Sequence, residues 1–304
     1  MAIQRELWVS YIQDNLFKNN SFIDRAYSES ASVLGGKVVH LPQAGAKPVV
    51  QKNTTGVGVA VSRTDTDITY NLDAYRTIPT VIEKAEQAEL SYEKMNSILG
   101  EHLEVLRERC GDEMAIKWLT GALEAGNVVS TTGADAAVTE SGQTGNRKTT
   151  KAIDVLALKT KMNKQNIAKD GRVLVCESNM LDQLVNDLSV TQQRDFSSAV
   201  DSATGVVGRL YGFEIIERSD VAICNGANSA VNAFGSTTLG TDNLVCLAFQ
   251  RNAVAKAVGE IDVFENTNDP LHYGNVYSAL VRFGGRARRT NAEGVFALVQ
   301  GAGS

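Results

Sequence analysis

The side chains that most often carry out chemistry in proteins are scarce in this chain, which has only 3 histidines and 4 cysteines in 304 residues. His40, His102 and His272 lie far apart in the sequence and have no metal-ligand spacing. We expect His102 to pack inside the protein, because it falls on the apolar face of a predicted helix. No grouping of Ser, His and Asp typical of a hydrolase can be recognised. The sequence therefore predicts no catalytic residue, no metal site and no cofactor.

The cysteines are widely separated and include no C-x-x-C pair, so neither a zinc site nor a redox motif is indicated. They are Cys110, Cys176, Cys224 and Cys246. We expect four reduced and mostly buried thiols, as in a protein made in a reducing cytosol. The start of the chain is charged where a secretory signal would be apolar, and no stretch approaches the roughly 20 apolar residues of a membrane span.

Two segments resemble ligand-binding loops only superficially. The run Asp65–Asp73 has the alternating aspartates of a calcium loop, but its sixth position is Tyr70 and its twelfth is Arg76. We expect an edge strand with outward-facing Asp and Thr side chains. The run Gly205–Gly212 has the glycines of a phosphate-binding loop without their spacing, and it precedes a strand instead of following one. We expect a tight turn there.

One basic cluster occurs near the end of the chain, and its members are Arg282, Arg286, Arg288 and Arg289. On a strand the first three share one face, and the fourth points the other way. No aromatic residues are interleaved for stacking on bases, so sequence-specific recognition of nucleic acid is not indicated. The cluster is consistent with ion pairs between subunits, with contact to nucleic-acid phosphates, or with a solvated surface.

The composition limits the class of protein. Hydrophobic residues make up 43% of the chain and charged residues 21%, which suffices for a folded core. The formal net charge of −5 argues against a dedicated nucleic-acid-binding protein, because such proteins usually carry a basic excess. The chain has 26 glycines and only 6% aromatic residues, so we expect many turns and few large core anchors.

The first 110 residues predict three kinds of structure. Residues 3–30 form a broken amphipathic stretch, which we expect to be an arm that packs on something else. Short β-like runs over 34–75 predict a ribbon with too little apolar mass to be stable by itself. A capping box of Thr80 and Glu83, followed by apolar residues at a spacing of about 3.6, predicts a long helix over 79–110.

The remainder predicts alternating helices and strands, in an α+β chain. We expect Gly111 to end the long helix and a loop to follow over 126–150. The expected helices cover 112–125, 153–167 and 178–188, the last capped by Ser178, and a polar, mobile stretch covers 191–205. The expected strands cover 172–177, 212–221, 243–249 and 275–289. The run 294–300 is expected to be the antiparallel partner of the last long strand.

Three stretches are similar to members of one known family. They are GGKVVHLPQAGAKPVV running into RTDTDITYNLDAYRTIP, then GVVGRLYGFEIIERSDV, and finally FQRNAVAKAVGEIDVF followed by HYGNVYSALVRFGGRARR. With the order of arm, ribbon, long helix, mixed region and terminal strands, they resemble the major capsid protein of tailed bacteriophages, which has the Hong Kong 97-type fold. The resemblance covers essentially the whole chain, and the order of the parts carries it.

The resemblance implies a structural protein, not an enzyme. It implies an N-terminal arm over 1–33, an extended β-ribbon loop over 34–77, a peripheral domain with a long spine helix over 78–150, an axial domain over 151–268, and closing strands of the peripheral domain over 269–304. Hexamers and pentamers of such a protein would assemble in the bacterial host cytoplasm into an icosahedral head enclosing double-stranded DNA, and would form the capsid of the virion.

The resemblance also implies partners. Some members carry a long scaffolding segment ahead of the ribbon, for which the arm over 1–33 is too short, so we expect a separate scaffolding protein. A portal, decoration or head-completion proteins and non-specific contact with packaged DNA are also implied, and a membrane is not. Some members crosslink a ribbon lysine to a neighbour's asparagine. Lys37, Lys47 and Lys52 lie in the ribbon, but nothing marks an acceptor or a catalytic acid, so we predict no crosslink. These lysines and the four clustered arginines are the candidate assembly residues.

Two other interpretations stay open. The same fold can form a nanocompartment shell of the encapsulin type, which holds enzyme cargo instead of DNA. A cytosolic α+β enzyme with a dispersed site belongs to a different class, and it would be a monomer or small oligomer with a pocket of perturbed titratable groups.

Overall fold

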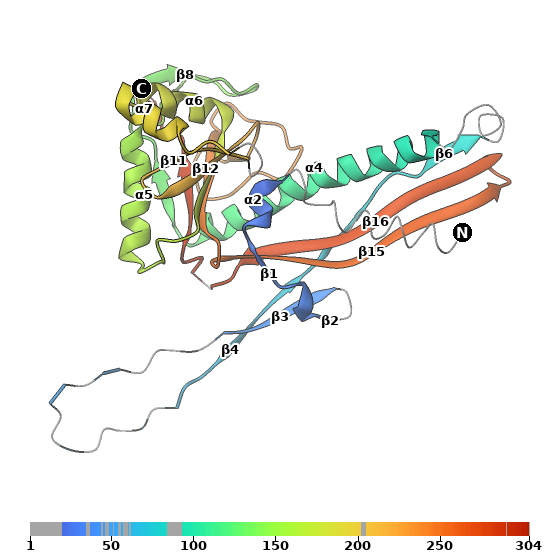
Figure 1. Cartoon of the computed structure of the whole chain (residues 1–304), viewed down its shortest axis with the longest axis horizontal. Coiled ribbons are helices and arrows are strands. Elements are labelled where there is room, and N and C mark those ends of the chain that lie inside the picture. Colours follow the sequence, from blue (N-terminus) through green and yellow to red (C-terminus); the bar gives the residue numbers. More distant parts are fainter. Residues whose placement is uncertain are drawn as a thin grey trace.

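The computed structural model of the chain describes residues 20–34, 37–43, 45, 49–50, 52–53, 56, 60, 62–83, 93–201, 205–289 and 291–303. Figure 1 shows a body that contains the C-terminus, a long arm of helix and strands, and a ribbon that projects away from both. The shape follows from two large sheets that meet at one end of the longest helix.

The body is built on a seven-stranded sheet in the order β11-β12-β10-β14-β17-β7, with β13 also paired to β14. Its strands are β7 (Val128–Ser130), β10 (Arg172–Glu177), β11 (Val206–Leu210), β12 (Phe213–Arg218), β13 (Ala222–Cys224), β14 (Asn243–Gln250) and β17 (Val295–Val299). Every residue of β10, β14 and β17 is buried, because side chains pack on both faces of the sheet.

Helices cover the two faces of this sheet. Helices α5 (Ala152–Lys164), α6 (Ser178–Asp187) and α7 (Val190–Ser197) pack on one face, and α2 (Ser21–Asp24) and α4 (Glu93–Glu124) pack on the other. Alternate residues of each strand enter different cores, as the two-residue period of a strand requires. The continuous apolar runs in the sequence therefore mark strands that are buried on both sides.

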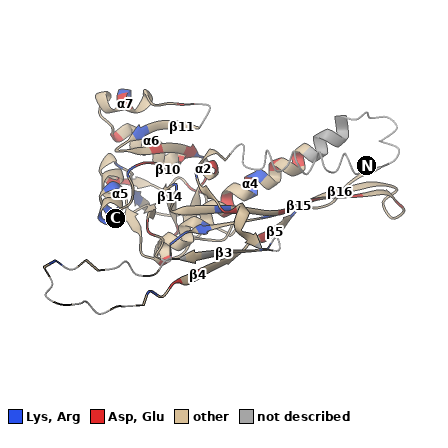
Figure 2. Cartoon of the chain, turned by 60° about the horizontal axis from the view of Figure 1, so that its bottom comes forward, with Lys and Arg blue, Asp and Glu red and all other residues tan. Residues whose placement is uncertain are grey.

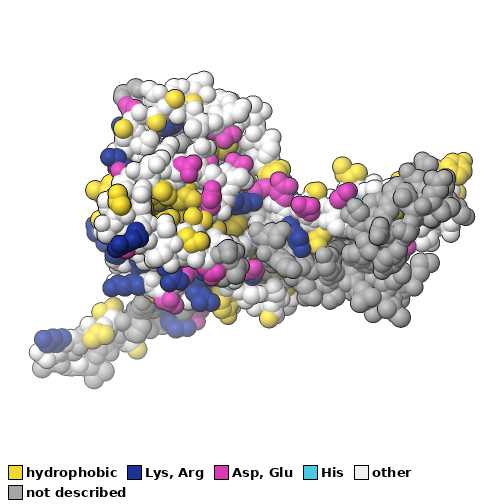
Figure 3. Space-filling view, turned by 45° about the horizontal axis from the view of Figure 1, so that its top comes forward, with side chains coloured by type: hydrophobic (Ala, Val, Ile, Leu, Met, Phe, Trp, Pro, Cys, Tyr) yellow, Lys and Arg dark blue, Asp and Glu magenta, His cyan; other side chains and the backbone are white. Residues whose placement is uncertain are grey.

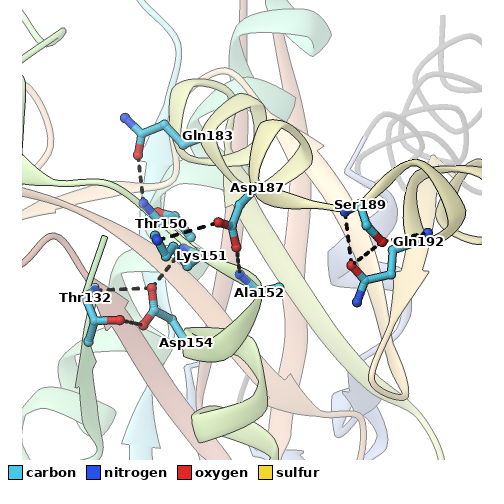
Figure 4. Close-up of polar contacts among 9 residues, drawn as sticks. All are labelled: Thr132, Thr150, Lys151, Ala152, Asp154, Gln183, Asp187, Ser189 and Gln192. Atoms are coloured by element: carbon cyan, nitrogen blue, oxygen red, sulfur yellow. Dashed lines mark hydrogen bonds and ion pairs between the residues drawn. The ribbon is translucent and has the colours of Figure 1, made fainter. Parts of the chain in front are cut away.

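Side chains from α6 hold the start of α5, where backbone N–H groups have no partner within the helix. Asp187 accepts a hydrogen bond from the N–H of Ala152 at 3.0 Å, and Gln183 accepts one from the N–H of Thr150 at 3.0 Å (Figure 4). Asp154 caps the same turn from within α5. These bonds fix the two helices against each other on one face of the sheet.

The arm is a five-stranded sheet beside α4. It contains β1 (Tyr27–Ser28), β5 (Asp73–Arg76), β6 (Thr80–Glu83), β15 (Val254–Asp269) and β16 (Gly274–Ala287). Strands β15 and β16 form one long antiparallel hairpin, and β5 and β6 both pair with β16. At about 1.5 Å per residue, α4 is roughly 48 Å long, so it spans the arm and enters the body (Figure 1).

The ribbon is a small sheet in the order β2-β3-β4, and a separate hairpin lies at the edge of the body. The ribbon strands are β2 (Val33–Leu34), β3 (Val38–Gln43) and β4 (Thr66–Asn71), and the hairpin strands are β8 (Asp135–Ala137) and β9 (Asn146–Lys148). Among the described residues, the buried core at the ribbon consists of Val39, Leu72 and Ala257. The third of these belongs to β15, so the base of the ribbon is anchored on the arm.

Trp118 of α4 joins the two large sheets. Its indole N–H donates to the carbonyl of Ala255 in β15 at 3.1 Å, and its ring packs against Phe249 of β14 and edge-on against Phe22 of α2. A Cβ at Gly285 would lie 2.9 Å from the indole nitrogen, so a side chain there is excluded. One residue thus connects the N-terminal segment, the long helix and both sheets.

The structure contains a long helix, but the predicted bounds of that helix are wrong. In the described residues, α4 runs over Glu93–Glu124 and passes through Gly111, whereas the predicted helix over 79–110 was expected to end there. The helix-start signals at Thr80 and Glu83 are wrong, because these residues form β6, which pairs with β16. Gly111 does not end the helix, and the expected helix over 112–125 is its continuation. Leu106, Cys110, Met114 and Trp118 form one unbroken buried stripe.

Several shorter predictions also need correction. The stretch over 191–205 is not simply polar and mobile, because α7 occupies much of it and is capped reciprocally by Ser189 and Gln192 (Figure 4). Glu177, not Ser178, caps α6, since its carboxylate accepts from the N–H groups of Asn179 and Met180.

The predicted strand pairing at the C-terminus is wrong. The run 294–300 contains β17, which pairs with β14 and β7 in the body, whereas the partner of β16 is β15. The loop expected over 126–150 contains β7 and the hairpin β8–β9. The predictions of a strand over 172–177, a strand over 243–249 and a helix near 153 are confirmed.

Gly111 of α4 lies too close to the side chains of Asn20 and Arg218 to accept a methyl group. An added Cβ would lie 2.4 Å from Asn20 Oδ1 and 2.7 Å from an Arg218 nitrogen, and both side chains already hold partners. We expect Gly111→Ala to lower the free energy of unfolding by about 1–2 kcal/mol, despite the better helix propensity of alanine.

Gly100 supplies the matched control for this prediction, because it lies in the same helix with open space around its Cα. We expect Gly100→Ala to raise the free energy of unfolding by about 0.5–1 kcal/mol. Denaturant unfolding of both variants checks the pair, and equal stabilisation by both would contradict the close packing at Gly111.

Candidate assembly surfaces

The basic cluster is mostly paired within the chain. Arg288 donates to Glu29 at 2.7 Å, Arg289 pairs with Glu293 at 2.6 Å, and Arg282 lies 3.6 Å from Glu260. Three of the four clustered arginines therefore have a carboxylate partner in their own subunit. The predicted sharing of one strand face fails for Arg288, because β16 ends at Ala287.

Arg286 differs from the other three arginines. It lies in β16 opposite Ala255 of β15, is half-buried, and lines a shallow pocket with Lys117 and Glu124 of α4. Among the residues that the structure describes, no hydrogen bond or ion pair of its guanidinium is found within the chain. It is the clustered arginine best placed to accept a partner from outside.

A buried carboxylate fixes the base of the ribbon. The side chain of Glu29 is only 2% exposed, and it accepts from Arg288 at 2.7 Å and from the Tyr70 hydroxyl at 3.1 Å. The Arg288 guanidinium also stacks over the ring of Tyr27, 4.2 Å from its centroid. Burial, with Glu29 beside it, raises the pKa of the Tyr70 phenol, so it remains a neutral donor. This cluster joins the N-terminal segment, the ribbon and the end of β16.

The candidate ribbon lysines are only partly placed. Lys37 and Lys52 are exposed, and Lys47 lies outside the described residues. Lys37 immediately precedes β3, where its carbonyl accepts from the N–H of Leu72 at 2.7 Å. Much of the predicted runs 47–51 and 57–61 also lies outside the described residues.

Large apolar side chains are exposed on the projecting parts. In the ribbon, Val49 is 87% exposed and Val50 is 92% exposed, and at the turn between β15 and β16 Leu271 and Tyr273 are about as exposed. Exposed apolar residues at such tips are not covered by their own chain, and such surfaces commonly mark contacts with other molecules.

Charges are mixed over the surface. Figure 2 shows acidic and basic residues interspersed along α4, and Figure 3 shows acidic side chains gathered where the body meets the arm. Glu101, Glu104 and Glu108 are exposed at spacings that place them on one side of α4. That side of the helix therefore presents a negative stripe.

Hydrogen bonds from Arg147, Gln143 and Thr144 hold a loop over 225–242 against the hairpin β8–β9. Arg147 of β9 donates to the side chain of Asn243 at 2.6 Å and to the carbonyls of Gly240 and Asp242 at 2.9 and 3.1 Å. Phe234 and Leu239 remain partly exposed on this loop. The loop is thus a shaped surface of the body.

The histidines lie in three separate places in the fold, and His102 is buried as expected. His40 contacts Asp67 in the ribbon, His272 contacts Asp269 at the arm's tip, and His102 is buried in α4, where burial lowers its pKa. Within the described part of the chain, no three His, Cys, Asp or Glu side chains come together to hold a metal ion. None of the helices described there is long and apolar enough to cross a membrane.

The two segments that superficially resemble ligand-binding loops, Asp65–Asp73 and Gly205–Gly212, both contain strands. Asp67 and Thr69 face outward on the edge strand β4, as predicted. The Gly205–Gly212 run contains β11 and a two-residue turn at Tyr211 and Gly212, both at positive φ, that leads into β12. The turn was expected, whereas the strand within the run was not.

Solved structures share this architecture. The chain matches one from Mycobacterium phage Che8 at 20% identity and a TM-score of 0.57, over 91% of this chain and 90% of that one. It matches the capsid structure of the Cyanophage P-SCSP1u at 16% identity and a TM-score of 0.62, over 93% and 88%. The capsid of Ralstonia phage GP4 matches at 14% identity and 0.61, over 92% and 87%. The protein has the Hong Kong 97-type capsid fold.

The family follows from the sequence model that describes phage capsid proteins, which matches residues 25–299. The chain therefore belongs to the phage capsid protein family, and the resemblance inferred from the sequence is confirmed. It is a structural major capsid protein of a bacteriophage, located in the capsid of the virion, where copies associate in the capsid lattice. Membership of this family points to a non-enzymatic protein. No curated protein matches the chain.

The buried carboxylate at the ribbon base yields a stability prediction. Arg288→Met keeps an apolar stem over Tyr27 but removes the charge that balances Glu29. We expect a loss of about 3 kcal/mol in the free energy of unfolding, because a buried carboxylate is left without its cation. Arg289→Met is the control, since its ion pair with Glu293 is exposed, and it should cost less than about 0.5 kcal/mol. Equal losses for both variants would show that Glu29 does not need Arg288.

Proposed function

We propose that the protein assembles as hexamers and pentamers into an icosahedral head that encloses double-stranded DNA. The observation that carries this proposal is the ribbon that projects from the rest of the molecule (Figure 1), in which Val49 and Val50 are exposed. In a heterologous contact, a surface of one copy packs against a different surface of the next copy. When the rotation between copies closes, the copies form a ring in which these surfaces are buried. Many modest contacts of this kind, repeated by symmetry, stabilise a shell.

The clustered arginines and ribbon lysines divide into two groups under this proposal. Arg282, Arg288 and Arg289 each lie beside a carboxylate of their own subunit. Arg286, with the exposed ribbon lysines Lys37 and Lys52, is available for carboxylates of neighbouring subunits or for DNA phosphates. Contact with DNA would be non-specific, because phosphate contacts carry no sequence information.

Other partners are part of the same proposal. A separate scaffolding protein, a portal, and decoration or head-completion proteins would act with the capsid protein, and assembly would take place in the host cytoplasm. We also propose a division into an N-terminal segment (1–33), the ribbon (34–77), a peripheral domain (78–150 and 269–304) and an axial domain (151–268). Strand pairing supports moving β15 into the peripheral part and β17 into the axial part.

A nanocompartment shell that holds enzyme cargo is the alternative for the same fold. Family membership favours the phage head. Electron microscopy of the expressed protein, with its scaffold where one is required, should show capsomers, shells or tubes, and the packaged content separates DNA from protein cargo. Small discrete oligomers under all conditions would contradict both shells.

The position of the ribbon outside the two large cores predicts that a deletion in it impairs assembly without impairing folding of the subunit. Deleting residues 40–52 removes exposed apolar side chains, and no described residue of this segment belongs to the two large cores. We expect a soluble body with cooperative unfolding that cannot close shells, as checked by thermal denaturation and electron microscopy. Loss of cooperative unfolding would show that the ribbon belongs to the core of its own subunit.

The absence of a crosslink is a second prediction for the assembled particle. Lys37 and Lys52 are exposed, and nothing in the sequence marks an acceptor asparagine with a catalytic acid. We expect mature particles to run as a single monomer band on a denaturing gel. A ladder of covalent multimers would overturn this prediction.

A further inference from the structure

Two cysteines meet in the centre of the body sheet. Cys176 is the fifth residue of β10 and Cys246 is the fourth residue of β14, and these strands are antiparallel neighbours. Both are buried, at 1% and 0% exposure, and both belong to the core beneath α5, α6 and α7. Their side chains therefore leave the sheet on the same face.

The register places the two cysteines opposite each other. The ladder between the strands runs as far as Val175 opposite Leu247, so the next pair along the strands is Cys176 opposite Cys246. At the other end of the ladder, the N–H of Arg251 donates to the carbonyl of Gly171 at 2.9 Å, which makes that pair a hydrogen-bonded one. Hydrogen-bonded and non-hydrogen-bonded pairs alternate, so the cysteines occupy a non-hydrogen-bonded pair.

A non-hydrogen-bonded pair suits a disulfide. Its Cα atoms are about 4.5 Å apart, which lies within the range of about 4.4–6.8 Å that disulfides span. The bridge would therefore need little movement of the strands. Helix α6 also begins directly after β10, so a third sulfur lies nearby, with Met180 Sδ 3.4 Å from Cys246 Sγ.

The environment of the two thiols slows their oxidation in the folded protein. A hydrogen bond with Cys246, together with burial, raises the pKa of the Cys176 thiol well above its usual value. A protonated thiol is a poor nucleophile, and a thiol that is fully buried does not meet oxidants freely. The other two cysteines are also buried, but they lie in different elements, Cys110 in α4 and Cys224 in β13.

We propose that Cys176 and Cys246 form an intrachain disulfide when the protein leaves a reducing compartment, with a low-molecular-weight disulfide as the oxidant. One cysteine, as its thiolate, attacks the oxidant to give a mixed disulfide and releases one small thiol. The second cysteine then displaces the other small thiol and closes the protein bridge. The two protons of the cysteines pass to the two released thiolates, and the cysteine pair loses two electrons to the oxidant.

The bridge would covalently join β10 to β14 in the middle of the body. Its biological setting rests on the proposed function, since a virion passes from the host cytoplasm to an oxidising exterior at release. The reaction itself does not depend on assembly. We expect it to take on the order of hours, because local opening must expose the thiols first.

The test uses the full-length protein under native conditions with oxidised glutathione. After quenching, the chain is denatured, alkylated and weighed, and a peptide map locates the bridge. We expect the mass of two hydrogens to be lost, two of the four cysteines to remain alkylatable, and one linked peptide to join Cys176 to Cys246. The oxidised protein should have a higher thermal midpoint, which a reductant reverses.

The controls use the remaining cysteines. Cys110→Ala should still form the bridge, whereas Cys176→Ala and Cys246→Ala should each keep three alkylatable thiols. If an alanine variant fails to fold, the peptide map of the unmodified sequence still decides the result. Four alkylatable thiols after prolonged oxidation, a stable glutathione adduct, or a bridge between other cysteines would each overturn the proposal. Shell formation is scored separately by electron microscopy, so a failure to assemble leaves this result unaffected.

Discussion

The hydrogen bond from the Trp118 indole to the carbonyl of Ala255 sets the relation between the two large sheets. Because Trp118 also packs against Phe249 and Phe22, the long helix is held where the arm sheet meets the body. Its C-terminal half becomes part of a core, and its N-terminal half extends along the hairpin. The molecule is elongated because the arm sheet and the N-terminal half of α4 extend away from the body beyond this junction (Figure 1).

A second constraint is the burial of Glu29. A carboxylate inside a protein requires both a counter-ion and hydrogen bonds, and here Arg288 and Tyr70 provide them from the end of β16 and from the ribbon. The ribbon is therefore directed by a polar cluster at its base, not by a core of its own. A part that has so few internal contacts can keep one direction only if its root is fixed.

The sequence was sufficient for the fold class and for the buried central strands, because a short apolar run such as that over 172–177 is typical of a strand covered on both faces. It was insufficient wherever long-range pairing overrode a local signal. Thr80 and Glu83 have the form of a helix cap, yet pairing with β16 makes them a strand. Gly111 has the form of a helix stop, yet it is required because Asn20 and Arg218 lie against the helix there. The apolar period that continues through Met114, Trp118 and Ala122 was the signal that could have corrected the helix.

The candidate site was predictable in residue type but not in role. The four clustered arginines lie within eight residues of sequence, and only the positions of Glu29, Glu260 and Glu293 show that three of them have partners within the subunit. Glu29 and Glu260 are distant in sequence from their partners, and Glu293, four residues after Arg289, lies beyond the strand, so alternation along the strand predicts none of these pairs. Cys176 and Cys246 are likewise related by strand register and not by spacing.

The outward-facing Asp67 and Thr69 on the edge strand β4 have a consequence for newly made subunits. An unpaired strand edge is a template on which identical strands stack, and a charged, hydroxyl-rich edge resists that stacking. Wherever free subunits are concentrated, indiscriminate edge-to-edge polymerisation would compete with ordered growth. The polar ribbon edge leaves side-chain contacts, which form and break readily, to govern how copies meet, and a misplaced copy can then leave before it is trapped.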